Sequence, residues 1–220
     1  MSPKLDVTLP SERVIKTMTK GEATAERILD AAFRSIATHG CGAVTLRGIA
    51  EEAGVALSQL NYHYGNKDSL FAAVLERMQQ DYMDALNERL QGRDTLTEQI
   101  MALVDYNEFI LHKSPDTYRN FLEFFNFAMS SKGFQPVVAN FTSGIAEVIE
   151  KSISQRQIRS KSEDAFAPAA VTRFILSASF GIALQHFLSP GNRDVRKGFG
   201  IIKATAAELI HSNRSSVSRR

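Results

Sequence analysis

Cysteine is nearly absent from this chain of 220 residues, which has a single one at position 41 and no tryptophan. One cysteine cannot form an internal disulfide, which fits a protein of a reducing compartment. We interpret Cys41 as a small apolar core residue rather than a redox sensor, because free cysteine usually behaves as a small buried hydrophobe.

Long apolar runs are also missing. No stretch approaches the roughly 20 consecutive apolar residues that a membrane-spanning helix needs. Residues 1–24 lack the apolar core and small-residue cleavage site of a secretory signal. We therefore expect a cytoplasmic protein with no membrane partner.

Signatures of catalysis and of metal binding are absent as well. There is no glycine-rich phosphate loop and no Gly-x-Ser-x-Gly elbow. The five histidines show no metal-ligand spacing; they are His39, His63, His112, His186 and His211. This favours a protein that is not an enzyme and that has no cofactor and no metal, although helical enzymes exist.

The excess of positive charge is small, at +2, whereas nucleic-acid-binding domains are often strongly basic. The positions of the charges carry more information than their sum. Arg47 and Lys67 fall at the starts of predicted helices, while Glu51 and Glu52 fall on the outer face of the first of these helices. A local basic face is therefore compatible with the nearly neutral total.

The apolar residues recur at helical spacing through most of the chain, and no strand pattern of any strength occurs. The stripe over 24–39 is one example, and Gly40 is expected to stop that helix. The predicted helices cover 24–39, 46–53, 57–63, about 67–90, 95–113, 115–131, 134–156, 164–188 and 192–212. The expected fold class is all-α.

The stretch from Thr45 to Leu70 has the most specific pattern. Two short apolar helical sets are separated by Gly54, and a second glycine, Gly65, ends the second set. Thr45 is a natural N-cap, and Gly54 can adopt the positive φ of a tight turn. The pattern predicts a helix-turn-helix, whose second helix enters the DNA major groove.

Within this stretch the residues resemble a known family. The run Thr-Leu-x-x-Ile-Ala-x-x-Ala-Gly-Val from Thr45 is followed by Leu60, by Tyr-His-Tyr at 62–64 and by Asn-Lys-Asp-x-Leu at 66–70. This is similar to the DNA-binding domain of the tetracycline-repressor (TetR-type) family of bacterial regulators, over about residues 24–75. The resemblance implies a homodimer that binds a palindromic operator in double-stranded DNA, usually as a repressor, and that a small-molecule effector releases.

The domain organisation follows from these patterns together. We expect a flexible arm at 1–20 and a three-helix DNA-binding domain at 21–68. A long helix should join it to a larger helical effector-binding and dimerisation domain at 69–212, before a flexible basic tail at 213–220.

The first turns of a recognition helix face the base edges, and its flanks face phosphates. The base-side candidates are Leu57, Ser58, Gln59 and Asn61; glutamine and asparagine can each pair with adenine, and leucine can meet a thymine methyl. By resemblance, Thr45, Tyr62, His63 and Lys67 match positions that hold phosphates in the family, and Arg47 lies near the same track.

Two residues depart from the family pattern. Ala56 stands where Ser or Thr is common, so an N-cap worth about 1 kcal/mol is lost unless Ser58 takes that role and the helix starts later. Asn61 stands where an aromatic residue is common, which exchanges a phosphate contact for a possible base contact.

The C-terminal half is rich in phenylalanine, and FLEFFNFAM over 121–129 places aromatic rings on more than one helical face. Most of these rings are expected in the core of a helix bundle, but a pocket or an interface should take some of them. The predicted effector-binding residues are His112, Phe121, Phe124, Phe125 and Phe174.

The last two predicted helices are expected to form the dimer interface, as a four-helix bundle about a two-fold axis. Their apolar stripes include small residues that allow close approach. The predicted interface residues are Val171, Ile175, Ala178, Ile182, Phe199, Ile202 and Ala206.

The leading hypothesis is a homodimeric, ligand-responsive transcriptional regulator, with a small apolar or amphipathic effector. Two alternatives stay open: a DNA-binding factor controlled by a protein partner, and an all-helical enzyme or small-molecule carrier with vestigial DNA binding. The sequence does not identify the operator, the effector or the regulated genes.

Overall fold

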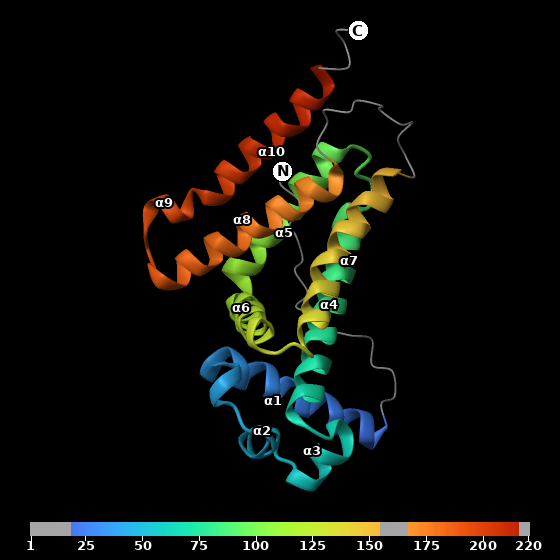
Figure 1. Ribbon diagram of the computed structural model, residues 1–220, viewed down its shortest axis with the longest axis vertical. Coiled ribbons are helices and arrows are strands. Elements are labelled where there is room, and N and C mark those ends of the chain that lie inside the picture. The colour runs from blue at the N-terminus through green and yellow to red at the C-terminus, as the bar shows by residue number, and fades with distance from the viewer. Residues whose placement is uncertain (1–18, 155–166, 216–220) are drawn as a thin grey trace, which may run out of the picture.

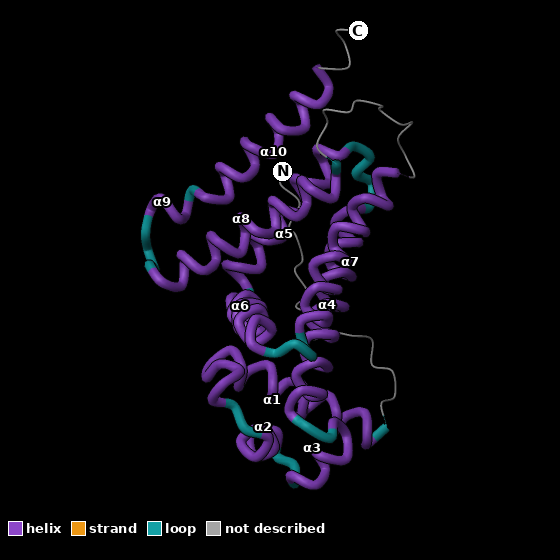
Figure 2. Tube along the Cα trace, in the orientation of Figure 1, coloured by secondary structure: helices purple, strands orange, loops and turns teal. Residues whose placement is uncertain are grey.

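The computed structural model describes residues 19–154 and 167–215, and this part of the chain consists of helices and the loops between them (Figure 2). Figure 1 shows α1–α3 gathered at one end, α4 leaving them toward the larger body, and α8 and α10 running together along one side. The helices are α1 (Lys20–Ala43), α2 (Leu46–Ala53), α3 (Leu57–Tyr64), α4 (Lys67–Leu90), α5 (Leu96–Lys113), α6 (Pro115–Ser130), α7 (Gln135–Ser154), α8 (Pro168–Leu188), α9 (Arg193–Arg196) and α10 (Gly198–Ser215).

The buried side chains of the small end belong to one hydrophobic core that continues into the larger body. Ile28 and Ile36 of α1 are fully buried, and Ile49 of α2 and Leu60 of α3 pack with them. Cys41 belongs to the same core, and its burial raises the pKa of the thiol to about 12, ahead of the effect of the nearby Glu123 carboxylate. A thiol that stays protonated is unreactive, in agreement with its interpretation as an apolar core residue.

Helix α1 is longer than its apolar stripe predicts. It begins after Thr19, whose hydroxyl accepts from the Glu22 amide at 3.2 Å while the Glu22 carboxylate accepts from the Thr19 amide at 2.7 Å. This reciprocal capping box adds a turn before the first apolar residue. At the other end Gly40 is non-helical, in agreement with its prediction as a helix stop, and one further helical turn follows it to Ala43.

Helix α4 bridges the two parts of the fold. Its buried residues run from Leu70 and Phe71 in the first turn to Leu86 and Leu90 in the last. The first turns pack on α1 and α3, and the later turns pack on α5 and α7. A tilt of the C-terminal end of α4 would therefore also move its N-terminal end, which contacts α3.

The larger body is packed with aromatic rings around a buried polar cluster. Phe121 stacks on Phe141 with their centroids 4.7 Å apart. Next to them, Asn107 donates to the Tyr82 hydroxyl at 3.0 Å and accepts from the Tyr118 hydroxyl at 2.8 Å. Three helices, α4, α5 and α6, are thus joined by hydrogen bonds inside an apolar core, where such bonds must be satisfied.

The end of the chain differs in detail from the prediction. The helix expected over 192–212 is divided at Lys197 into the short α9 and the longer α10. Residues 1–18 of the predicted arm, residues 216–220 of the predicted tail, and residues 164–166 of the helix expected over 164–188 lie outside the described part of the chain.

Helix α8 is the most apolar helix of the fold. In the described residues, its stretch Ala169–Leu188 is long and apolar enough to cross a membrane by length and composition, although the sequence pattern had excluded such a run. Core helices of soluble proteins pass the same test when they are mostly buried, but only 33% of this stretch is buried here. Much of this apolar stretch is therefore accessible to solvent in the single chain.

Candidate nucleic-acid interface

The first helix of the predicted motif is capped as its sequence indicates. The Gly48 amide donates to the Thr45 hydroxyl oxygen at 3.1 Å. At the other end Gly54 is left-handed, with φ of 64°, and closes the turn toward α3. The Thr45 oxygen is the acceptor in this cap, so its hydroxyl hydrogen stays available for the predicted phosphate contact.

The recognition helix α3 starts at Leu57 even though Ala56 provides no side-chain cap. The Gln59 side chain replaces part of the missing cap, because its Oε1 accepts from the Ala56 amide at 3.1 Å. The alternative in which Ser58 caps a later start is therefore wrong. Gln59 must release this bond, or share it, before it can pair with a base.

Helix α3 exposes most of its surface. Leu60 is its one fully buried residue, and the Tyr64 hydroxyl, at the end of the helix, donates to the Ala25 carbonyl of α1 at 3.0 Å. These two contacts hold one face of α3 against α1. The four base-side candidates, Leu57, Ser58, Gln59 and Asn61, are all exposed, so each of them is accessible from outside the protein.

The predicted phosphate-binding residues flank this surface. Tyr62 is 86% exposed, and its ring meets that of His63 edge-on at 5.4 Å. Arg47 is exposed and lies 3.7 Å from Glu51, one turn along α2. Lys67 is only half-buried, at the first position of α4.

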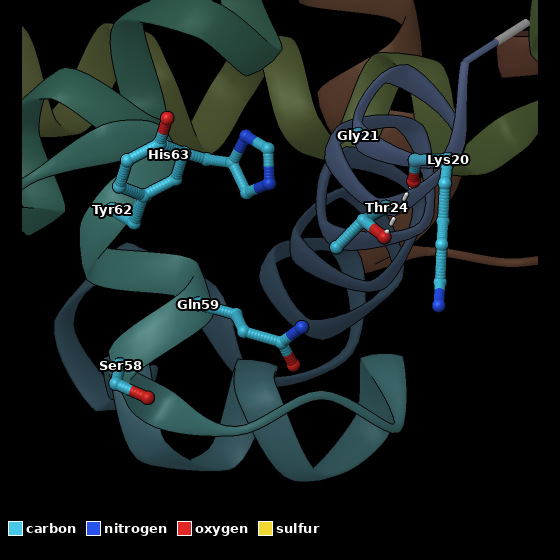
Figure 3. Close-up of a pocket in the computed structure, with 7 residues that line it drawn as sticks. All are labelled: Lys20, Gly21, Thr24, Ser58, Gln59, Tyr62 and His63. Carbon is cyan, nitrogen blue, oxygen red and sulfur yellow. Dashed lines mark hydrogen bonds between the residues drawn. The ribbon is translucent and has the colours of Figure 1, made fainter.

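A groove between the start of α1 and α3 adds a residue that the sequence pattern did not single out. The groove has a volume of about 370 Å³. Figure 3 shows Lys20 and Thr24 on α1 across from the side chains of Ser58, Gln59, Tyr62 and His63. The sequence pattern places Lys20 in the predicted arm, because the capping box of Thr19 and Glu22 precedes the apolar stripe of the helix. In the structure Lys20 is one of the residues that line this groove.

Acidic groups near this surface are paired rather than free to repel DNA. The Glu52 carboxylate accepts from Arg34 Nε at 2.9 Å and from the Ser35 hydroxyl, both on α1. Glu51 is next to Arg47. Glu52 thus fastens α2 to α1, in addition to lying on the outer face that its sequence position predicts.

The predicted effector residues are not all brought together. Phe121 and Phe124 are buried and Phe125 is half-buried, on consecutive turns of α6. Phe174 is 46% exposed, because α8 turns its neighbour Ile175 into the core. Placing Phe174 with the interior rings was therefore wrong. His112 is also exposed, beside His186 of α8 with ring centroids 6.0 Å apart.

The predicted dimer-interface residues mostly face the interior of their own chain. Val171, Ile175, Phe199, Ile202 and Ala206 are buried there, and Ala178 and Ile182 are half-buried. This choice of face was wrong, because the apolar pattern of α8 extends around the whole helix. The exposed apolar or small residues of the same helices are Ala170, Phe174, Ser177, Gly181, Leu184 and Leu188 of α8 and Gly200, Ile201 and Ala204 of α10.

Comparisons with known proteins agree with this arrangement. Residues 28–74 match the family model of bacterial regulatory proteins of the tetR family. The HTH-type transcriptional regulator BetI of Brucella anthropi is 30% identical over 105 residues, which are 48% of this chain and 54% of that protein. The chain spans about half the length of the curated relatives of this kind that it matches.

Solved structures share the fold over most of the chain. A TetR transcription regulator from Haloarcula marismortui has a TM-score of 0.69 at 20% identity, covering 86% of this chain and 97% of that one. The regulator FadR from Bacillus subtilis has a TM-score of 0.68 at 14% identity, covering 82% of this chain and 96% of that one. Residues 28–74 thus match the N-terminal domain of the tetR family of bacterial regulatory proteins, and the described chain shares the fold of these regulators.

Proposed function

We propose that this protein is a transcriptional regulator that acts in the cytoplasm as a repressor and binds a palindromic operator as a homodimer. The observation that carries the proposal is the accessible surface of α3, where four side chains suited to base edges lie between groups suited to phosphates. Residues 21–68 form the DNA-binding domain in this proposal, and Lys20 joins its phosphate-binding flank.

Dimerisation is assigned to α8 and α10. Their outer face carries exposed apolar residues, with Gly181 and Ala204 between them, and a second copy of the pair would cover it in a four-helix bundle. A two-fold dimer of this kind reads both halves of a palindrome when its recognition helices are about 34–36 Å apart, or a multiple of that distance.

Release from DNA is assigned to a small apolar or amphipathic effector bound within residues 69–212. Support comes from the concentration of rings on α6, together with the polar cluster of Asn107 and Tyr118 close to Phe121. The B. subtilis FadR structure, which shares the fold, is a complex with stearoyl-CoA. An effector can act only if its affinity differs between the DNA-competent and DNA-incompetent states.

A mobility-shift assay with the DNA upstream of its own gene tests the proposal. We expect a shift by the wild-type protein, and loss of the shift when Gln59 and Asn61 are both replaced by alanine. A thermal-shift screen of fatty acids, acyl-thioesters and aromatic amphiphiles should find compounds that raise the melting temperature, by RT ln(1 + [L]/Kd) in free energy, and that abolish the DNA shift. Stable protein that shifts no DNA would refute DNA binding.

A further inference from the structure

Helix α1 is bent at Gly40, where φ is 77° and ψ is 156°. A non-helical residue inside a helix removes the following amide from the ladder of backbone hydrogen bonds, and that amide then needs another acceptor. The Cys41 amide donates to Oε2 of Glu123 on α6, at 2.9 Å. Glu123 therefore caps the last turn of α1 from a helix that is 82 residues further along the chain.

The fit between Gly40 and Glu123 is close. A Cβ at position 40 would lie 2.9 Å from Oε2 of Glu123, and the positive φ already favours glycine. One turn earlier on α6, the fully buried Asn120 donates to the Phe33 carbonyl of α1 at 3.0 Å. Helix α6 is thus fastened to α1 at two successive turns, once at the bend and once before it.

The last turn of α1 determines where the helix-turn-helix begins. Only Val44 and Thr45 separate Ala43, the end of α1, from Leu46, the start of α2. The Glu52 carboxylate of α2 is bonded back to Arg34 of α1 at 2.9 Å. A change of the backbone conformation at Gly40 would therefore move α2, and it would move α3 through the turn at Gly54.

Helix α6 contains both the cap and the rings of the predicted effector site. Phe121 and Phe124 are within one turn of Glu123, on the side of α6 that faces the aromatic core. A displacement of α6 that makes room among these rings must also move the Glu123 carboxylate relative to the Cys41 amide. Packed helices of this kind adopt discrete arrangements, because close-packed interiors do not deform continuously.

We propose that Glu123 is a positioning residue for the helix-turn-helix, and that α6 controls DNA affinity through the hydrogen bond from the Cys41 amide to this carboxylate. This inference rests on the proposed function, because it assigns the regulation of the same DNA-binding surface. This role depends on the acceptor oxygen and on the length of the side chain that carries it, and it does not depend on the negative charge.

Three substitutions of Glu123, made in the full-length protein, distinguish the effect of side-chain length from the effect of side-chain charge. Glu123→Gln keeps an acceptor oxygen at the same reach without charge, Glu123→Asp keeps the charge but is one methylene shorter, and Glu123→Ala removes both. Asp116→Ala is the matched control, since Asp116 is an exposed carboxylate of the same helix, 3.6 Å from Arg119.

Backbone amide exchange measured by NMR tests the hydrogen bond without DNA. Loss of an N-cap weakens a helix end by an amount equivalent to roughly 2- to 30-fold in an equilibrium constant. We expect Cys41 to exchange faster by about this factor in the Ala and Asp variants, and at close to the wild-type rate in the Gln variant and the control. Unchanged exchange at Cys41 in both the Asp and Ala variants would overturn the assignment.

The second readout is affinity for a duplex that the wild-type protein selects from a random DNA pool. We expect the Ala and Asp variants to bind it roughly 2- to 30-fold more weakly, the range of an N-cap, and the Gln variant to bind like wild type. Equal affinities of the Gln and Ala variants would overturn the inference. If the wild type selects no duplex, the proposed DNA binding is wrong instead. The amide exchange of Cys41 then still tests whether Glu123 caps this amide. If Glu123→Ala does not fold, the comparison of Gln with Asp gives the same decision.

Discussion

The Lys67 ammonium lies 5.3 Å from the centre of the Phe71 ring, over its face. Phe71 is fully buried and meets Phe124 and Phe127 of α6 edge-on, at 6.0 and 5.7 Å between centroids. A cation–π contact at a partly exposed site contributes about 0.5–1 kcal/mol, whereas a hydrogen bond to a charged group contributes about 1.5–3 kcal/mol. Lys67 can therefore exchange its contact with the Phe71 ring for a hydrogen bond to a DNA phosphate.

Replacing Lys67 by alanine is expected to weaken binding to the same extent on every DNA sequence, because phosphate contacts carry no base information. The slope of log K against log salt should fall by about one in magnitude. Tyr62→Phe should also weaken binding uniformly, but without a change of slope, since no charge is lost. Both effects can be measured by fluorescence anisotropy over a salt series.

Lys151→Ala is the matched control for Lys67. Lys151 is an exposed lysine near the end of α7 that is remote from α3 (Figure 1), 3.6 Å from Glu147. Its removal should leave affinity and salt slope unchanged. An unaltered salt slope in Lys67→Ala would show that the assignment of Lys67 to a phosphate is wrong.

Substitution of Gln59 or Asn61 by alanine is expected to relax specificity rather than to lower all affinities. Each good bidentate contact to a base discriminates by about 1–3 kcal/mol against the wrong base. The measurement is the affinity for duplexes that differ from the selected site at single positions. Each variant should lose its preference at one position of each half-site and keep the others.

Gln59 needs an additional control, because its side chain also accepts from the Ala56 amide. Gln59→Glu retains an acceptor for that amide but loses the amide donor that adenine N7 requires. If specificity is unchanged in Gln59→Glu while Gln59→Ala is merely less stable, the residue supports the start of α3 and does not read a base.

Local signals allowed the helix-turn-helix to be predicted nearly to the residue. Thr45, Gly54 and Asn66 act on their own neighbours, and α2, α3 and α4 begin or end where these residues indicate. The helical turn that follows the non-helical Gly40 could not be predicted in this way. The acceptor that keeps the helix going after Gly40 is Glu123, which is far away in sequence.

The faces of α8 were less predictable for a related reason. A helix that is apolar all round has no single stripe, so periodicity cannot select the side that faces its own core. Packing makes the choice: Ile175 is turned inward and Phe174 outward. The same ambiguity led to the grouping of Phe174 with Phe121 and Phe124 as effector residues. In contrast, the all-α class and the bridging α4 followed directly from the sequence.

The stability of the protein is expected to fall at alkaline pH. Burial raises the pKa of Tyr106 to about 12, and it also raises the pKa values of Tyr82 and Tyr118. An unfolded tyrosine ionises near pH 10, so the folded state retains the proton while the unfolded state loses it. The stabilisation from Tyr106 is complete below about pH 10 and is lost as the pH rises toward 12.

Urea denaturation between pH 8 and pH 11 measures this effect. The free energy of unfolding should decline above pH 10, and Tyr106→Phe should make the decline shallower. Tyr62→Phe is the control, because Tyr62 is outside the core. A decline of the same steepness in Tyr106→Phe and in wild type would assign the pH dependence to other groups.

The outer face of α8 and α10 is expected to hold the dimer together. Leu184 and Ile201 are 46% and 64% exposed in the single chain, in contrast to the buried Ile202. Leu184→Arg should therefore yield folded monomers, with the wild-type circular dichroism spectrum, whereas a charge at Ile202 should unfold the body. Sedimentation velocity at micromolar concentration distinguishes these outcomes.

Operator binding tests whether this face also sets the spacing of the recognition helices. A monomer can occupy only one half-site at a time, so Leu184→Arg should lose most of its affinity for a two-half-site duplex, although α1–α3 are unchanged. Met129→Arg is the matched control, because Met129 is 76% exposed on α6 and lies outside this face. It should remain dimeric and bind DNA like wild type. A wild-type protein that sediments as a monomer and still protects both half-sites would contradict the assignment, and the apolar surface of α8 would then need a different partner.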